Sequence, residues 1–394
     1  MNGSSDGYSA AQALRTGASE AARAALLEIR QHTLEHVRAW RDFGLQVPRR
    51  AWLNPPLWEW GHVAWFQEWW VGRNPERHRG SAANPLAPRA PSLVAQADDW
   101  YDSSRVPHER RWDLPLPGPT PMLDYLGRSL DATLRHLDAL GSDPGEDELY
   151  FFRLAALHEA MHVEASAYMA RGLGLVLAGA GDTAAASCNA RLRLPSQVFR
   201  AGSSGGFAFD NELAAHEVHL GAFEIDAEPV SWSRFQGFVD EGGYEQRHWW
   251  SDEGWAWCKA SRQHPPGGPA DACAVHLSAF EAEAWCRWAG RRLPTEFEWE
   301  CAALAEPGFR WGGVWEWTAS VFLPYQGFAA HPYRDYSAPW FGTRRVLKGA
   351  AAATSPWLAH PRYRNFFEPQ RTDIFAGFRS CGAPAPALGS NRGR

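Results

Sequence analysis

The segment DELYFFRLAALHEAMHVEASAYMARGLG, Asp147 to Gly174, decides the fold of the first half of this chain. Its apolar residues recur at helical spacing and it ends in glycine, so it predicts one long helix. His158 and His162 are four residues apart, which places both imidazoles on one helix face, within reach of one metal ion. The letters also match H-E-x-x-H, a zinc-protease signature. Three interpretations follow: a protease, another metal site, or two histidines that only pack.

Three further segments have helical patterns. They are Ser19–Phe43, which opens with a possible cap, Pro55–Gly72, which opens with two prolines, and Thr120–Leu140. Four such helices predict an antiparallel bundle over residues 15–175, and bundles build metal sites from side chains on facing helices. A long loop, Arg89–Pro119, separates the second helix from the third, and a loop of that length is usually functional or disordered.

The histidine pair needs a third partner before it indicates a metal site. His32 and His36 have the same spacing, so spacing alone proves little. His62 lies in the aromatic second helix and becomes a candidate ligand once the bundle brings it to the pair. A protease is disfavoured, because the metzincin continuation is missing and no glutamate occurs between Glu164 and Glu212. Three neutral imidazoles suit zinc and iron equally, so spacing does not choose the metal.

The second half has a different texture, with short, glycine-punctuated and aromatic segments. An Ala/Gly-rich stretch over residues 176–194 predicts a linker, and residues 195–383 predict a second domain. His276–Ala303 reads as one or two helices, broken at Leu293-Pro294. The ends, residues 1–14 and 384–394, are expected to be disordered. The fold class expected for the whole chain is α+β.

Composition excludes several classes of function. The chain has 394 residues, 45% of them hydrophobic, which suffices for two cores. The net charge of −6, without a long basic run, argues against nucleic acid as the main partner. No apolar run reaches the roughly 18 residues of a membrane span, and the N-terminus lacks a signal peptide pattern. Six cysteines without CxxC spacing argue against a disulfide framework. A soluble cytoplasmic protein is therefore expected.

Four ordered motifs in the second half carry a family resemblance. They are FDNELAAHEVHLGAFEIDAEPVSWSRFQGFV (Phe209–Val239), WAGRRLPTEFEWE (Trp288–Glu300), GGVWEWT (Gly312–Thr318) and RNFFEPQRTDIFAGFR (Arg364–Arg379). Together they resemble the formylglycine-generating-enzyme (sulfatase-modifying factor) fold, a C-type-lectin-like domain. The first half is similar to a DinB-type four-helix bundle. This order of domains is that of the ergothioneine sulfoxide synthases, non-haem iron enzymes that use O₂ to join a sulfur donor to hercynine.

This resemblance implies a cofactor and roles for particular residues. The family's iron site falls on His62, His158 and His162, so the implied cofactor is Fe(2+). The family's Y-x-x-Y motif is matched by YRDY, which makes Tyr333 the catalytic proton donor and places Tyr336 at the substrate site. The formylglycine-generating enzyme itself fits poorly, because its copper-binding cysteine pair has no counterpart late in the chain.

The donor-binding segment departs from the ergothioneine enzymes. Those that use γ-glutamylcysteine carry NWDYPIRR where this chain has NFFEPQRT, so Phe367 replaces the aspartate that pairs with the donor's ammonium. A glutamine of the family is Met161 here. The substrate-binding positions implied by the resemblance are Tyr336, Asn365, Phe366, Phe367, Arg371 and Met161.

The wording NPPLWEWGHVAWFQEWW, HEAMHVEA and YDSSRVPHERRWDLPLP is similar to the selenoneine synthase branch of this family, which joins a selenosugar to hercynine. A neutral sugar needs no carboxylate partner, which agrees with Phe367. The expected partners are therefore hercynine, O₂ and a selenosugar or thiol donor. Two alternatives stay open: an ergothioneine-type sulfoxide synthase that forms a C–S bond, and a non-catalytic lectin-like binding module with a metal bundle.

Overall fold

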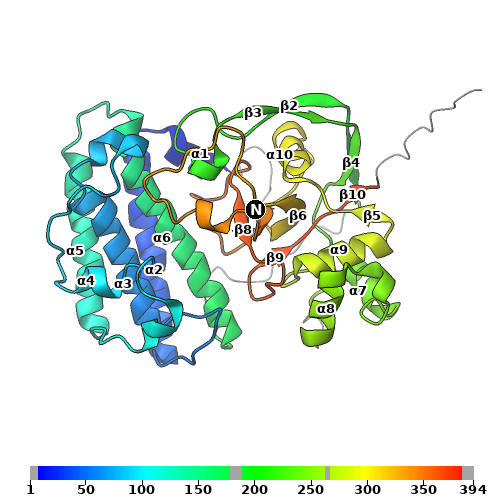
Figure 1. Cartoon of the computed structure of the whole chain (residues 1–394), viewed down its shortest axis with the longest axis horizontal. Helices are drawn as coiled ribbons and strands as arrows, with labels where there is room; N and C mark the ends of the chain where they lie inside the picture. Colours follow the sequence, from blue (N-terminus) through cyan, green and yellow to red (C-terminus); the bar gives the residue numbers. More distant parts are fainter. Residues whose placement is uncertain (1–7, 178–188, 262–266, 384–394) are drawn as a thin grey trace, which may run out of the picture.

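The computed structural model describes residues 8–177, 189–261 and 267–383. It has an all-helical part, residues 8–177, and a C-terminal part of mixed helices and sheets, residues 189–383 (Figure 1). The expected α+β class is confirmed. No helix within the described ranges is both long and apolar enough to cross a lipid bilayer.

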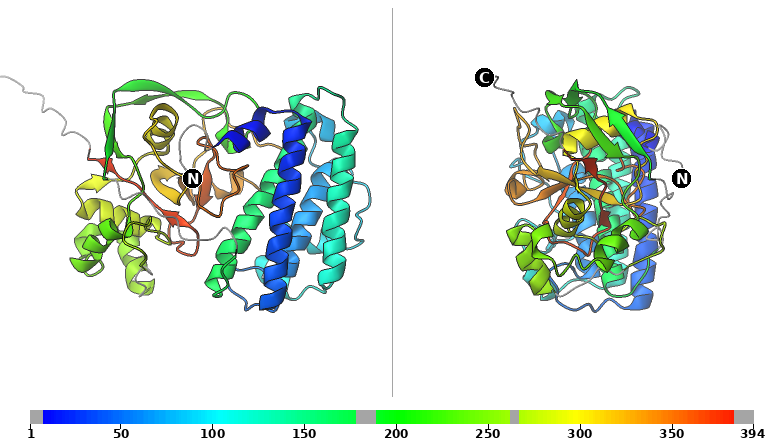
Figure 2. Two further views of the ribbon diagram at one scale, coloured as in Figure 1. Left: turned by 180° about the vertical axis from the view of Figure 1, so that it is seen from behind. Right: turned by 90° about the vertical axis from the view of Figure 1, so that its right-hand side faces the viewer.

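Four long helices pack side by side in the helical part (Figures 1 and 2). They are α2 (Ser19–Phe43), α3 (Pro56–Gln67), α5 (Pro119–Asp138) and α6 (Glu146–Gly172). The π-helical turn η1 (Glu68–Gly72) extends α3. These bounds lie within two residues of the predicted ones, because apolar periodicity, prolines at the first turn and a terminal glycine mark helices clearly. A buried ion pair between Arg30 and Glu159, 2.6 Å apart, ties α2 to α6.

Two predicted boundaries are wrong. Residues 9–14 were expected in a disordered tail, but they belong to helix α1 (Ser9–Thr16), which buries Ala11 and Leu14. Residues 191–194 were expected in the linker, but they form strand β1 (Arg191–Leu194), paired antiparallel with β4. Both elements are short and gain their stability from distant partners, which local patterns do not reveal. Of the remaining residues of the expected tails and linker, 1–7, 178–188 and 384–394 lie outside the described ranges.

The connection between α3 and α5 is folded against the bundle. It contains three short helical segments, η2 (Arg77–Ala82), α4 (Ala97–Trp100) and η3 (His108–Trp112). Tyr101, just after α4, is fully buried. Its ring lies over Gly61 of α3, where a Cβ atom would stand only 2.1 Å from the tyrosine Cε1. Tyr101 therefore anchors the long loop in the core, and Gly61 permits its close approach.

The C-terminal part has two four-stranded sheets and a two-stranded ribbon. The first sheet has the order β1-β4-β10-β5, the ribbon is β2-β3, and the second sheet has the order β8-β7-β6-β9. The strands after β1 are β2 (Gln197–Ala201), β3 (His216–Leu220), β4 (Phe223–Asp226), β5 (Arg291–Arg292), β6 (Trp315–Val321), β7 (Arg345–Gly349), β8 (Asn365–Phe367), β9 (Ala376–Gly377) and β10 (Cys381–Gly382). All pairs are antiparallel except β6 with β9.

Helices cover these sheets. They are η4 (Asp210–Glu212), α7 (Trp232–Asp240), η5 (Arg247–Trp249), α8 (Asp252–Ser261), α9 (Ala279–Trp288), α10 (Glu296–Ala305) and η6 (Ala338–Trp340). The predicted break at Leu293-Pro294 is confirmed, since α9 ends and α10 begins on either side of it. Each of these two helices opens with a capping box, Ser278 with Glu281 and Thr295 with Glu298.

Helix α6 is the element of the bundle that faces the C-terminal part (Figure 1). The Trp315 indole N–H of β6 donates to Glu164 Oε1 at 2.6 Å, and the Thr354 hydroxyl donates to Glu164 Oε2 at 2.5 Å. Burial raises the pKa of Glu164 to about 7. About four turns earlier along α6, the Tyr150 hydroxyl lies 2.9 Å from His331 Nδ1. Side chains along α6 thus join the two parts directly.

The contact between Gly61 and Tyr101 leads to a stability prediction. Gly61→Ala should lower the free energy of unfolding by about 1–3 kcal/mol, because the new methyl group pushes a buried ring. The control is Gly127→Ala in α5, where a Cβ meets nothing within 4 Å. That change should raise stability by up to about 1 kcal/mol through helix propensity. Thermal unfolding of both variants checks this, and a Gly61→Ala Tm at or above that of Gly127→Ala would contradict it.

Candidate metal centre and active site

Three histidines meet where α3 packs against α6. His62 comes from α3, and His158 and His162 come from successive turns of α6. One ring nitrogen from each lies within 4.8 Å of the others, and the ring centroids are 4.5–5.0 Å apart. In the part of the chain that the structure describes, no other group of three potential ligands lies this close. The structure thus brings together the three residues that the sequence singled out as metal ligands.

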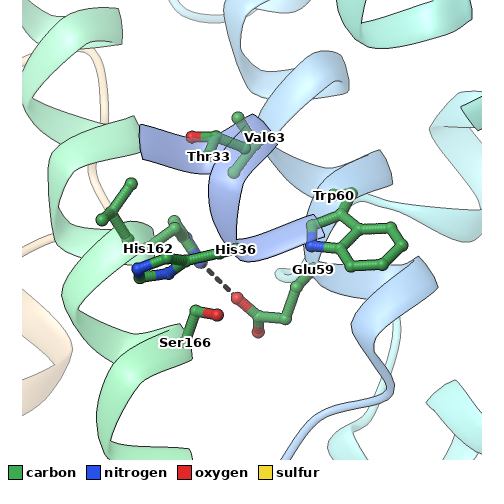
Figure 3. A pocket seen from close by; sticks show the side chains of 8 residues that line it. Thr33, His36, Glu59, Trp60, Val63, His162 and Ser166 are labelled. Carbon is green, nitrogen blue, oxygen red and sulfur yellow. Dashed lines mark hydrogen bonds and ion pairs between the residues drawn. The ribbon is translucent and has the colours of Figure 1, made fainter. Parts of the chain in front are cut away.

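Hydrogen bonds orient two of the three rings. His62 Nδ1 lies 2.7 Å from the Tyr101 carbonyl oxygen, which can only accept, so this nitrogen carries the proton. His162 Nδ1 lies 2.6 Å from Glu59 Oε2 and donates in the same way (Figure 3). In the neutral form of each ring, a proton on Nδ1 leaves Nε2 as the nitrogen with a free lone pair. Fixing the tautomer through the second nitrogen is how proteins prepare a histidine ligand.

Aromatic rings pack against His62 and His158, and burial keeps these two rings uncharged. His62 stacks on Trp58, with centroids 4.9 Å apart, and His158 lies flat against Phe66 at 3.5 Å. Burial, with a further contribution from His162, lowers the pKa of His62 to about 3 and that of His158 well below its usual value. Both rings are therefore uncharged at pH 7, the state in which imidazole binds a metal.

Glu59 supplies a negative charge beside these neutral rings. Burial alone would raise the pKa of Glu59, but the His162 contact and the nearby His62 and Arg111 lower it overall. The Asn54 side-chain amide donates to its other oxygen at 2.6 Å. This carboxylate was not predicted as a site residue. The only local signal was a glutamate three residues before His62, one helical turn away.

A small cavity borders this contact on the side of α2 (Figure 3). It has about 20 Å³ of room for the centre of a water molecule, which suffices for one water. The lining residues are Thr33 and His36 of α2, Glu59, Trp60 and Val63 of α3, and His162, Val163 and Ser166 of α6. His36, four residues after His32, therefore lies near the cluster without being part of it.

The histidine cluster fits a divalent transition metal. Three imidazoles on two packed helices can supply three nitrogen ligands and leave coordination positions for small molecules. The helices fix the ligands before any ion arrives, since His62 and His158 are buried. This arrangement resembles catalytic rather than structural metal sites, which are closed by four protein ligands.

The two predicted tyrosines lie on the C-terminal side of the cluster. The ring of Tyr333 is 4.9 Å from that of Phe66 and 6.1 Å from that of His158. Burial raises its pKa, so the hydroxyl keeps its proton at neutral pH. Tyr336 is farther back, where its hydroxyl lies 2.9 Å from that of Tyr363 and points to the Met161 sulfur at 3.8 Å.

Tyr363 is a neighbour that sequence reasoning missed. Its hydroxyl also contacts the Met161 sulfur, at 3.3 Å. Tyr336 and Tyr363 therefore both contact Met161, the residue that precedes His162. Phe209 stacks on Tyr336 from the other side at 4.4 Å. These rings come from three separate segments of the C-terminal part, and only the fold brings them to α6.

Among the predicted donor-binding residues, Phe366 is packed against the core, whereas Phe367 and Arg371 contact each other. Phe366 stacks on Phe322 at 4.1 Å and contributes to the core of the C-terminal part. Arg371 lies over the Phe367 ring at 5.2 Å and 5.8 Å from the ring of Tyr168 on α6. Its Nε donates to Asp373 at 2.5 Å. Asp373 was not predicted, and it neutralises the one arginine of this segment that was expected to bind substrate.

Asn365, the remaining predicted position, opens strand β8 and is partly buried. Its backbone pairs with Leu347 of β7, and its side-chain oxygen accepts from the Phe366 N–H at 2.9 Å. The structure therefore places Asn365, Phe367 and Arg371 on one segment, with Arg371 reaching toward α6.

Comparison with known proteins agrees with this architecture. Residues 179–311 and 308–383 match the sulfatase-modifying factor enzyme 1-like domain. The chain is 31% identical over 433 residues to a hercynine oxygenase of Mycolicibacterium thermoresistibile, covering 90% of this chain and 93% of the relative. It is 30% identical over 403 residues to a hercynine oxygenase of Mycobacterium tuberculosis, covering 83% and 90%. A formylglycine-generating enzyme of Streptomyces coelicolor is 27% identical over 264 residues, covering 45% of this chain and 82% of the relative.

The fold and the matches define an oxygen-dependent oxidoreductase built from a helical bundle and a sulfatase-modifying-factor domain. The similarity to the formylglycine-generating enzyme covers less than half of the chain, whereas the similarity to the hercynine oxygenases covers both parts. The chain belongs to the hercynine oxygenase family.

The histidine cluster leads to a metal-binding prediction. His158→Ala should abolish stoichiometric binding of Fe²⁺, because it removes one of three nitrogens and opens a gap beside Phe66. His32→Ala in α2 is the control and should bind like the wild type, since His32 is outside the cluster. Metal analysis after anaerobic loading measures both. Equal iron content in the wild type and His158→Ala would refute the assignment.

Proposed function

We propose that this protein binds Fe(2+) at His62, His158 and His162 and uses O₂ to join hercynine to a selenosugar through a C–Se bond. Family membership supports hercynine as the substrate, since the relatives named above are hercynine oxygenases. The observation that carries the choice of donor is the segment from Phe367 to Asp373, in which the only arginine is already paired.

The three histidines hold the ion and leave part of its surroundings open for substrates. Iron in that position supplies redox chemistry with O₂ and a binding position for a soft donor atom. Joining the selenol to the imidazole carbon removes one hydrogen atom from each partner, and O₂ accepts the two electrons and two protons. The protein therefore has to exclude bulk water and manage protons near the histidines.

Tyr333 is the residue that we assign to proton transfer. Its hydroxyl is protonated at neutral pH because burial raises its pKa, and its ring packs on Phe66 beside His158. A positioned acid of this kind stabilises negative charge as it develops on a reacting oxygen. Tyr336 and Tyr363 line the next part of the wall, and aromatic faces of this kind attract the trimethylammonium group of hercynine.

The donor preference follows from charge. Arg371 and Asp373 form an ion pair against the Phe367 ring, so their net charge is zero and their hydrogen-bonding groups are partly used. A γ-glutamyl dipeptide brings one ammonium and two carboxylates. To gain a partner of opposite charge here, each of these groups would have to break the ion pair between Arg371 and Asp373. A selenosugar brings hydroxyl groups and a selenolate. Neutral hydroxyls suit an apolar wall edged by a paired arginine and carboxylate, and burying an unpaired charge there is costly.

A second candidate is an ergothioneine-type sulfoxide synthase that takes a thiol donor. Asp373 is the observation in its favour, because a donor ammonium that displaced Arg371 would find a carboxylate there. The relatives' similarity extends over both parts of the chain and does not distinguish the two donors. A non-catalytic binding module is disfavoured by membership of an oxygenase family.

Tyr333→Phe should reduce the rate of coupling to hercynine by at least about tenfold, because the variant keeps the ring and loses the proton. The iron content and the Tm should stay at wild-type values, since the Tyr333 ring packing on Phe66 is retained. Mass spectrometry of timed reactions in air gives the rate. Undiminished coupling in a variant with full iron would remove Tyr333 from the mechanism.

In a competition between 1-seleno-glucose and γ-glutamylcysteine at equal concentration, with limiting hercynine, the selenium adduct should dominate. Leaving an ammonium buried and unpaired should cost the dipeptide roughly 2–5 kcal/mol, about 30- to several-thousand-fold in affinity. Products counted by mass give the ratio. Phe367→Asp, which restores a carboxylate, should shift the ratio toward the dipeptide. A wild-type pool dominated by the γ-glutamylcysteine adduct would favour the second candidate.

A further inference from the structure

Glu59 joins the histidine cluster to a chain of partly buried polar groups. It lies on α3, three residues before His62, yet its carboxylate accepts from His162 on α6 at 2.6 Å. Its other oxygen accepts from the Asn54 side chain at 2.6 Å, and Asn54 in turn accepts from Arg111 Nη1 at 2.8 Å. Three hydrogen bonds thus lead from an arginine in the long loop to the second nitrogen of a histidine in the cluster.

The same arginine also acts on the other helix of the cluster. The Arg111 guanidinium lies 3.7 Å from the centre of the Trp58 ring, and Trp58 stacks on His62 at an angle of 8°. One cation is therefore connected to His162 through hydrogen bonds and to His62 through stacked rings. Through these contacts Arg111, in η3, is one of the residues that hold the loop between α3 and α5 against the bundle.

The three histidines consequently have different surroundings. His62 donates to a neutral backbone carbonyl, His158 lies flat on the Phe66 ring, and His162 donates to a carboxylate. A histidine whose second nitrogen donates to a carboxylate is a stronger electron donor than one that donates to a carbonyl. Glu59 is 5% exposed, so water does little to weaken its field.

We infer that Glu59 is a positioning residue for the metal centre, which fixes His162 and strengthens it as a ligand, and that Asn54 and Arg111 hold Glu59 in place. The inference rests on the three-histidine metal site proposed above, and it is independent of which donor the enzyme uses. It predicts that charge, not only shape, is needed at position 59. Figure 3 shows the carboxylate directed at the His162 ring.

The test measures metal affinity of the full chain without substrates. Metal-free wild type, Glu59→Gln and Glu59→Ala are titrated anaerobically with Fe²⁺, and separately with Co²⁺, against a competing chelator. Glu59→Ala should bind about 10- to 100-fold more weakly, and Glu59→Gln about tenfold more weakly, because glutamine keeps the size and an acceptor but loses the charge. The visible bands of the Co²⁺ form should also shift in Glu59→Gln.

Glu68→Gln provides the matched control. Glu68 is also a buried glutamate on the same helical run, but it accepts from the Ser92 hydroxyl, the Leu93 N–H and the Tyr125 hydroxyl, not from a histidine of the cluster. This variant should bind both metals like the wild type. Circular dichroism establishes that each variant is folded, and if Glu59→Ala does not fold, Glu59→Gln decides the question alone.

The outcomes separate this inference from the function proposed above. Wild-type affinity and unchanged Co²⁺ bands in Glu59→Gln would overturn the role of Glu59 and leave the three-histidine site standing. Equal losses in Glu59→Gln and Glu68→Gln would also overturn it, since the effect would then reflect general stability. A wild-type chain that binds neither metal would instead refute the metal site itself.

Discussion

Helix α6 has to be buried on two sides at once, and this requirement governs the rest of the structure. One side of the helix packs against α2 and α3 and carries His158, His162 and Glu159. Another side meets the C-terminal part through Tyr150, Glu164 and Tyr168. A helix in this position needs apolar or paired residues nearly all round, which explains why its sequence has little polar surface. The site forms where the two buried sides meet.

Burial determines the chemistry that the site can support. Several buried charges elsewhere among the described residues are paired, as in Arg15 with Glu212 and Lys348 with Glu300. At the histidine cluster the protein places neutral rings beside a single carboxylate and encloses them in aromatic side chains. Such surroundings favour an ion that can replace the missing positive charge. The same aromatic wall continues through Tyr333 to Tyr336, whose ring centroids are 5.8 Å apart.

Sequence patterns predicted the long helices and the three histidines that the fold brings together, but not the residues that surround those histidines. The helices of the bundle were predictable because a 3.6-residue period repeats over several turns, and the two histidines of α6 follow from that period. Strands of two to five residues, as in β5 and β9, are too short for any period to appear. Glu59, Tyr101 and Asp373 owe their roles to contacts made in the folded chain. Only the resemblance to a family pointed to Tyr333 in advance.

The contacts of Glu164 have a consequence for how the molecule comes apart. Its carboxylate accepts hydrogen bonds from Trp315 and Thr354 of the C-terminal part. Removing the C-terminal part would therefore expose to water a face of α6 that is buried in the whole chain. A bundle cut free at residue 177 would expose this face and would tend to aggregate. We therefore expect the two parts to unfold as one cooperative unit on heating, in a single transition in which the histidine cluster is lost together with the sheets.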